Sequence, residues 1–554
     1  MTILKVDMSQ KELSPEVFPK DVVVGGRAMI AYLMSEYCPP TAHPLSEESI
    51  FVLAPGLLGG TAAPQINRIS VGGKSPLTGG IKEANSGGTI AFALSRLGLR
   101  AVMVSGKSDE WQILKITKEG ASLEPAGDIV GMKNYDACDR LRERYGDKIA
   151  VACIGRAGEM GMASATVAVT DMEGRPSRHC GRGGLGAVMG AKKLKAVVVD
   201  DAGGKLRKPA QKDEFREAAQ QAVKHIKEFP FTPFFHSIGT HGSTQEDSDR
   251  GSLPSYNHRS GSFDKVANIN HEKYVELIDS RGGVKGHGCM PGCVVKCSTI
   301  FNDEAGNFVT AGFEYETVGL LGSNLGIDDL DAITRMEREC DDYGVDTIEV
   351  GATIGILNDV GLFEFGDSAT AMSYLDEIGK GSPMGRILGS GSVAAGKAYG
   401  IDRIPSVKGQ AIPAHAARSL KGWGVTYATS PMGGDHTAGL VVEDPLSPVG
   451  QVERSRNAQI FHAALDSAGF CMFTFMPPEI AAALISSFYG VDWTADDYLE
   501  MGKEVLRKER AFNINAGISE QADGLPDWMT KEPLPPTNAV WDVPREEYMD
   551  LFNF

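Results

Sequence analysis

The chain has 554 residues, too many for one hydrophobic core, so its length predicts two or three domains. Its hydrophobic content of 42% and charged content of 23% are those of a soluble globular protein. The net charge of −17 argues against a nucleic-acid partner. No apolar run reaches the roughly 18 residues of a membrane span, and the charged N-terminus lacks the apolar centre of a signal peptide. We therefore expect a cytoplasmic protein.

Short β-branched runs separated by glycine-rich turns dominate residues 1–203 and predict a β-rich first domain. One helix is expected over 89–98, where Gly98 would end it. The runs that predict strands are 21–26, 49–56, 100–106, 148–155, 165–171 and 194–200.

Helical periodicity takes over after residue 203. A long helix is expected to end at Pro230, and another over 328–344 places Leu330, Ile333, Met336 and Cys340 on one face. A third helix is expected over 452–469, and the proline-rich end of the chain should wrap the surface. The predicted class is α+β, with a β-rich domain over 1–203 followed by mainly helical domains over 204–400 and 401–554.

A short D-x-x-G pattern occurs at the ends of two of these helices. The first copy has Asp341, Gly344 and Asp346, and the second has Asp466, Gly469 and Cys471. Each glycine can adopt the left-handed conformation that ends a helix. We expect each copy to turn two polar side chains toward a common point.

Three of the nine cysteines lie within nine residues, at Cys289, Cys293 and Cys297. Three clustered thiolates can hold zinc, for which His287 is a further candidate ligand, or an iron–sulfur cluster that takes a fourth cysteine from elsewhere in the chain. Cys471 is the natural fourth ligand. Spacing alone leaves iron–sulfur, zinc and no metal open. The single cysteines are expected to be small buried apolar residues; they are Cys38, Cys138, Cys153, Cys180 and Cys340.

Several longer motifs resemble the tungsten-containing aldehyde:ferredoxin oxidoreductase family over most of the chain. They are "APGLLGGTAAPQINRISVGGKSPLTGGIKEANSGG", "RHCGRGGLGAVMGAKKLKAVVV", "GFEYETVGLLGSNLGIDDL", the D-x-x-G pair and "GWGVTYATSPMGGDHTAG". The resemblance implies that the β-rich domain cradles a tungsten-bis(pyranopterin dithiolene) cofactor between itself and the helical domains.

The resemblance also assigns residues to that cofactor. Asp341, Asp346 and Asp466 would grip the pterins, where a carboxylate accepts neighbouring N–H groups. Arg68 and Arg178 would meet the pterin phosphates, and the carbonyls of Asn85 and His179 would bind a Mg²⁺ that links those phosphates. The remaining cofactor-binding candidates are Ser86, Gly87, Gly88, Arg182, Gly183 and Gly184, the glycines because they let the backbone approach a bulky ligand.

For catalysis the resemblance indicates Glu316 and His436, beside the tungsten. Glu316 would act as general base or orient water, and His436 would donate a hydrogen bond to the substrate oxygen. Glu314 would share a strand face with Glu316 if that segment were extended. Cys289, Cys293, Cys297 and Cys471 would hold a [4Fe–4S] cluster that passes electrons to ferredoxin or an iron–sulfur partner subunit.

The leading hypothesis is therefore oxidation of an aldehyde to the carboxylic acid, in a homo-oligomer or hetero-complex. The alternative is the catalytic subunit of a tungsten-dependent reductase of aromatic acyl-CoA thioesters of the benzoyl-CoA type. An iron–sulfur protein that has lost the pterin and a zinc-stabilised scaffold are the other classes. Four features depart from the family pattern: the three-residue gap after Cys289, and the residues His415, Ala416 and Ala438.

Overall fold

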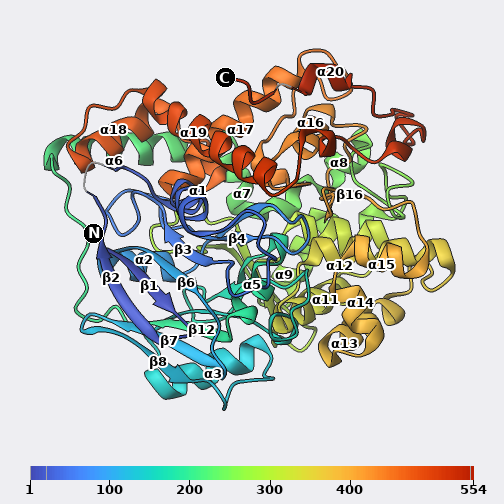
Figure 1. Ribbon diagram of the computed structural model, residues 1–554. Helices are drawn as coiled ribbons and strands as arrows, with labels where there is room; N and C mark the ends of the chain where they lie inside the picture. The colour runs from blue at the N-terminus through green and yellow to red at the C-terminus, as the bar shows by residue number, and fades with distance from the viewer. Residues whose placement is uncertain (1, 20–21, 550) are drawn as a thin grey trace.

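The computed structural model describes residues 2–19, 22–549 and 551–554. Two β-sheets built from the first 200 residues lie at the lower left of Figure 1. Helices lie above them, along the top, and beside them, on the right. The predicted α+β class, with a sheet-rich N-terminal part followed by helices, is confirmed.

Each N-terminal sheet has six strands. The strands of the first sheet are β1 (Thr2–Asp7), β2 (Glu12–Val17), β3 (Phe51–Pro55), β4 (Ile69–Lys74), β5 (Ile81–Ser86) and β6 (Leu99–Ser105). Those of the second are β7 (Gln112–Thr117), β8 (Gly120–Pro125), β9 (Ala150–Cys153), β10 (Val167–Val169), β11 (Arg178–Cys180) and β12 (Leu194–Val199).

The two sheets repeat one topology. The first has the order β2-β1-β6-β3-β4-β5, and the second, counted from its other edge, has the order β8-β7-β12-β9-β10-β11. In each sheet one pair is parallel, β1 with β6 and β7 with β12, and all other pairs are antiparallel. This duplication of topology is visible only in the structure.

Apolar side chains alternate along the strands and build a core between the sheets, with a helix on each outer face. Between the sheets, Phe51 and Leu53 of the first sheet and Leu114 of the second pack in one cluster with residues of α2 (Ile90–Arg96) and α5 (Leu185–Ala191). On the outer faces lie α1 (Gly26–Tyr37) and α3 (Asn134–Tyr145).

Five of the six predicted strand runs and the predicted helix α2 (Ile90–Arg96) are present. The run over 21–26 is wrong as a strand: Asp21 lies outside the described residues, the next residues are irregular, and α1 begins at Gly26. The three valines there are therefore part of the entry into a helix.

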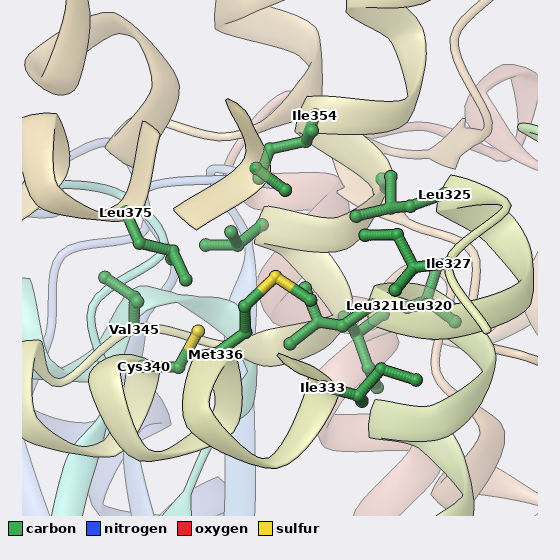
Figure 2. Packing of buried hydrophobic residues seen from close by; sticks show 14 of the residues in the cluster. Leu320, Leu321, Leu325, Ile327, Ile333, Met336, Cys340, Val345, Ile354 and Leu375 are labelled. Carbon is green, nitrogen blue, oxygen red and sulfur yellow. The ribbon is translucent and has the colours of Figure 1, made fainter. Parts of the chain in front are cut away.

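The middle of the chain packs around α11 (Leu330–Tyr343). The predicted apolar face is confirmed, because Leu330, Ile333, Met336 and Cys340 are all buried in one cluster. Figure 2 shows Met336 and Cys340 facing Leu375 and residues of the neighbouring turns. The other elements are α12 (Thr347–Ile356), α13 (Ser368–Lys380), α14 (Pro383–Gly389), α15 (Ser392–Tyr399) and the small sheet β13 (Val284–His287), β14 (Ser298–Asn302) and β15 (Phe308–Ala311).

A third group of helices lies along the top of Figure 1: α16 (Lys421–Thr429), α17 (Gln451–Ala468), α18 (Pro478–Tyr489) and α19 (Ala495–Asn515). The long helix that was predicted to end at Pro230 is α6 (Lys212–Glu228). It packs against α18, although the predicted boundary at 204 assigns it to the middle domain. The chain end packs onto α16 through Trp541, as expected for a tail that wraps the surface. The domain boundaries themselves stay a prediction.

Across the described residues, no helix is long and apolar enough to cross a membrane.

Candidate cofactor site and thiol cluster

Both D-x-x-G motifs end helices in the expected way. Gly344 follows α11 with φ 73°, and Gly469 follows α17 with φ 89°. Both angles are in the left-handed region, where a side chain would be strained. Asp341 lies in the last turn of α11 and Asp466 in the last turn of α17, each three residues before the glycine. Each helix ends beside one of the two N-terminal sheets.

Each of these aspartates meets the same strand position in one of the two sheets. The Asn85 amide on β5 donates to Asp466 Oδ1 at 3.1 Å, and His179 Nε2 on β11 lies 3.1 Å from Asp341 Oδ1. Asn85 faces Ser70 of β4 and His179 faces Ala168 of β10, so the two residues are equivalent in the repeated topology. The motifs and sheets thus form two related half-sites.

The equivalence also includes the residue just before β4 and the residue just before β10. Arg68, just before β4, bonds to the side chain and carbonyl of Asn85. Thr166, at the matching position before β10, bonds through its hydroxyl to His179 Nδ1 at 2.7 Å. Sequence reasoning missed Thr166, because it shares no chemistry with Arg68.

Buried acids line both half-sites. Burial, with some contribution from Asp342, raises the pKa of Asp341 to about 8. Burial and the nearby Glu83 raise the pKa of Asp466 well above its ordinary value. Arg27 lies 3.5 Å from Asp466 and makes a two-pronged ion pair with Glu509, which ties α1 to α17 and α19.

The three candidate arginines differ in how far the protein satisfies them. Within the described part of the chain, Arg68 bonds only to neutral Asn85, and Arg178 bonds to Ser298 at 2.8 Å while its Nε has no partner. Arg182 is fully engaged with Asp346 and the carbonyls of Ala411 and Gly434. Arg68 and Arg178 therefore have capacity left for an oxyanion such as a phosphate, whereas Arg182 joins three segments.

The candidate glycines serve close packing within the protein. A Cβ at Gly87 would lie 2.9 Å from Cys289 Sγ, and one at Gly88 would lie 2.5 Å from Val169. Gly183 has φ 83°, and its Cβ would meet the Lys82 side chain at 2.4 Å. Gly184 and Ser86 are also buried. A Cβ at Gly184, which has φ 75°, would lie 2.2 Å from the carbonyl oxygen of Ala163, so such contacts explain all four glycines without a ligand.

The distant cysteine lies with the cysteine loop. Cys289 and Cys471 pack with Met290 in one buried cluster, and Cys293 packs against it. Gln65, which sequence reasoning missed, connects the two segments: its carbonyl accepts from Cys471 N at 3.0 Å, and its side-chain amide lies 3.5 Å from Cys293 Sγ. The only sequence signal was its place just before Arg68 in a family motif.

Among the described residues, no three His, Cys, Asp or Glu side chains converge on a point where one metal ion would be held. A cubane places each thiolate on its own iron, so its ligands need not converge. His287 is bonded to Glu173 at 2.9 Å. All nine cysteines are free, and the five single ones are buried.

Glu316 lies between two histidines. Its Oε2 accepts from the Ala414 amide at 2.7 Å, and its Oε1 lies 3.5 Å from His415 Nε2 and 3.7 Å from His436 Nε2. Glu314 would share a face with Glu316 only in an extended segment, and this condition is not met, because residues 315–317 form a helical turn, α10 (Tyr315–Thr317). Glu314 instead bonds to Thr240 and lies 3.7 Å from Arg178.

Protonation and packing make this acid unusual. Burial raises the pKa of Glu316 to about 8 and lowers the pKa values of His436 and His415 to about 3 and 4. His415 stacks between the rings of Tyr315 and Trp423, with centroids 4.7 and 4.2 Å away. Glu316 Oε1, His436 Nδ1 and Trp423 Nε1 are buried without a hydrogen-bond partner among the described residues. These unpaired polar atoms fit a site that takes a polar substrate.

Known proteins resemble this chain in sequence and in fold. Models of the N-terminal domain and of domains 2 and 3 of aldehyde ferredoxin oxidoreductase match residues 3–201 and 217–552. The tungsten-containing aldehyde ferredoxin oxidoreductase of Pyrococcus furiosus is 30% identical to this chain, over 96% of this chain and 91% of its own length. That of Pyrococcus horikoshii is 31% identical to this chain, over 96% of this chain and 92% of its own length. A solved active-site complex BamBC of benzoyl coenzyme A reductase with 1,5-dienoyl-CoA has the same fold, with TM-score 0.84, 20% identity and coverage of 100% of this chain and 93% of that one.

These matches make the protein an oxidoreductase. It belongs to the aldehyde ferredoxin oxidoreductase family.

Proposed function

We propose that the protein is a tungsten-bispterin enzyme that oxidises an aldehyde to the carboxylic acid. The observation that carries this proposal is the pair of equivalent half-sites, in which Asp341 and Asp466 meet His179 and Asn85. Two like ligands need two like binding sites, and Arg68 and Arg178 retain capacity for their phosphates. The tungsten named for the Pyrococcus relatives agrees with this.

The residues present fit the groups that the proposal requires. Asp341, Asp346 and Asp466 would hold the pterins, and the carbonyls of Asn85 and His179 would be ligands of a Mg²⁺ that supplies positive charge to the phosphates. Cys289, Cys293, Cys297 and Cys471 would hold a [4Fe–4S] cluster. When bound, the tungsten group would accept two electrons and the cluster would release them one at a time.

Glu316 and His436 perform the proton chemistry in this proposal. Oxidation of an aldehyde consumes one water and releases two protons and two electrons. The carboxylate of Glu316 is placed to take a proton from that water, through the Oε1 that lacks a partner. His436 is neutral at pH 7, so it can donate a hydrogen bond to the substrate oxygen without adding a charge.

A reductive role is the second candidate. The ring set of Tyr315, His415, Trp423 and His436 beside Glu316 suits a planar aromatic substrate such as a benzoyl thioester. Under this alternative, Glu316 would deliver a proton instead of removing one.

Turnover of the purified protein without oxygen separates the candidates. We expect oxidation of benzaldehyde or acetaldehyde with benzyl viologen as the electron acceptor. Reduction of benzoyl-CoA by a low-potential donor, with no aldehyde oxidation, would assign the reductive role, and inactivity in both assays with the metals bound would contradict both.

A further inference from the structure

An exposed aromatic helix lies beside the four thiols. It is α7 (Phe231–Ile238), where Phe231 is 57% exposed and Phe234 and Phe235 are partly buried. Large apolar side chains gathered on one short surface helix are typical of a face that a partner covers. We call Phe231, Phe234, Phe235 and the lysines Lys224, Lys227 and Lys296 the α7 face.

Direct contacts connect this face to the cysteines. The Phe235 ring lies 4.6 Å from that of Phe473, which packs against Cys289 and Cys471. Gly239 follows α7, and its Cβ would lie 2.8 Å from the carbonyl oxygen of Cys297. The helix therefore sits on the loop that would hold the cluster.

The thiols are also close to solvent on this side. Cys293 and Cys297 are partly exposed, and Lys296 between them is exposed. The last turn of α6 is joined to the segment after Cys471, because His225 Nε2 lies 2.9 Å from the carbonyl oxygen of Thr474. A partner seated here would thus lie next to the cluster.

Charge indicates the kind of partner. Lys224 and Lys227 on the last turns of α6 and Lys296 on the cysteine loop are exposed. None of the three has an ion-pair partner in the part of the chain that the structure describes, although Glu228 is adjacent to Lys227. In a chain of net charge −17, such a group of unpaired lysines favours an acidic partner. The same lysines would repel a second copy of this face.

We propose that the α7 face docks an acidic iron–sulfur protein that takes electrons from the thiol-held cluster. The inference rests on the proposed function and adds the site of electron exit. In each docking event one electron passes outward: the cluster of this chain is oxidised, the partner's cluster is reduced, and no atom is transferred. Two such events remove the two electrons of one aldehyde.

The test uses the holoenzyme and an acidic two-cluster [4Fe–4S] ferredoxin as the probe. The Kd is measured by anaerobic titration calorimetry at 50 and 300 mM NaCl for wild type and for the double variant Lys224→Glu/Lys227→Glu. Lys397→Glu is the matched control, because Lys397 is an exposed lysine on α15, across the molecule from α6 (Figure 1). We expect binding by the double variant to be weaker by about tenfold or more, wild-type affinity to fall with salt, and the control to match wild type.

A Phe231→Ser variant tests the apolar part of the face, and we expect it to weaken binding at both salt concentrations. Iron content and viologen-linked turnover should be unchanged in all variants, since none of these side chains touches the candidate active site. An unchanged Kd in the double variant, or no binding by wild type at 50 mM NaCl, would overturn the proposal. The proposal would also be overturned if the Phe231→Ser variant sediments with a lower mass than the wild-type protein, because the α7 face would then be an interface between two copies of this chain. If the protein binds the ferredoxin in a charge-dependent way but does not oxidise aldehydes, the proposed function is contradicted and the docking proposal is not.

Discussion

At the scale of single residues, Glu316 is the most informative side chain. It is a buried carboxyl between two histidines that burial keeps neutral, and one of its oxygens lacks a partner. A carboxyl held this way has a pKa suited to moving protons near neutral pH.

The pKa of Glu316 predicts a pH dependence. Because the carboxylate is the base and its pKa is raised to about 8, kcat/KM for aldehyde oxidation should rise about tenfold per pH unit below 8 and level off above it. His436 and His415, with pKa values near 3 and 4, are neutral throughout this range and should add no inflection. Initial rates between pH 6 and 9.5 test this; a profile that falls as pH rises through 8 would assign Glu316 as an acid instead.

Removing the charge of Glu316 should remove most turnover. Glu316→Gln keeps the shape and the bond from the Ala414 amide but cannot accept a proton, so we expect a loss of roughly 10² to 10⁴ in kcat. Metal content should be unchanged, as measured by elemental analysis. Glu304→Gln is the comparison, because the Glu304 side chain is 89% exposed; near-normal rates in the Glu316 variant would move the role to another group.

At the scale of elements, the turn after β5 is a seat for the cysteine loop. The Gly88 amide donates to the carbonyl of Cys289 at 2.8 Å, and Gly87 leaves no room for a side chain. The position of the first thiol thus depends on this turn.

Gly87→Ala should therefore displace the cysteine loop. The added Cβ would come within 2.9 Å of Cys289 Sγ, a contact that real structures avoid. We expect the variant to fold but to lose iron, seen as reduced cluster absorbance near 400 nm. Gly127→Ala is the control, because nothing lies within 4 Å of its added Cβ. Full iron content in Gly87→Ala would show that the loop is not seated there.

The sequence predicted elements better than their relation in space. Apolar periodicity found α11 and its buried face, and glycine chemistry found both helix ends. The helical segment that contains Glu316 was not predicted: residues 315–325 pass from α-helical to π-helical to 3-10 geometry, so their apolar residues follow no single helical period. Gln65 was missed because its role depends on a segment more than 200 residues away.

At the scale of the whole molecule, the organising feature is the repeated sheet topology. Matching positions can differ in residue type, as Asn85 and His179 or Arg68 and Thr166 show, although Val71 and Val169 are the same. A sheet needs only the right alternation of apolar residues, so topology can repeat without identical residues. For this reason the sequence could not reveal the duplication, although it did supply both aspartates that face it.

Arg27 joins the first and third parts of the chain. It is fully buried between Asp466 and Glu509, and their charges hold its pKa above the usual range despite burial. Arg27→Ala would leave two buried acids without their cation, at a cost of about 3–5 kcal/mol. The variant should show a clearly lower Tm by calorimetry, while Arg140→Ala, which removes an exposed ion pair with Glu143, should stay close to wild type. Equal Tm values would mean that Arg27 is not needed to join these parts.

The most direct test of the account is the composition of the protein purified without oxygen. Two half-sites and four thiols predict, per chain, about one tungsten, two pterins and about four irons. Elemental analysis together with pterin extraction measures all three. One pterin per chain, or iron without tungsten, would contradict the claim that the two half-sites together hold one metal group.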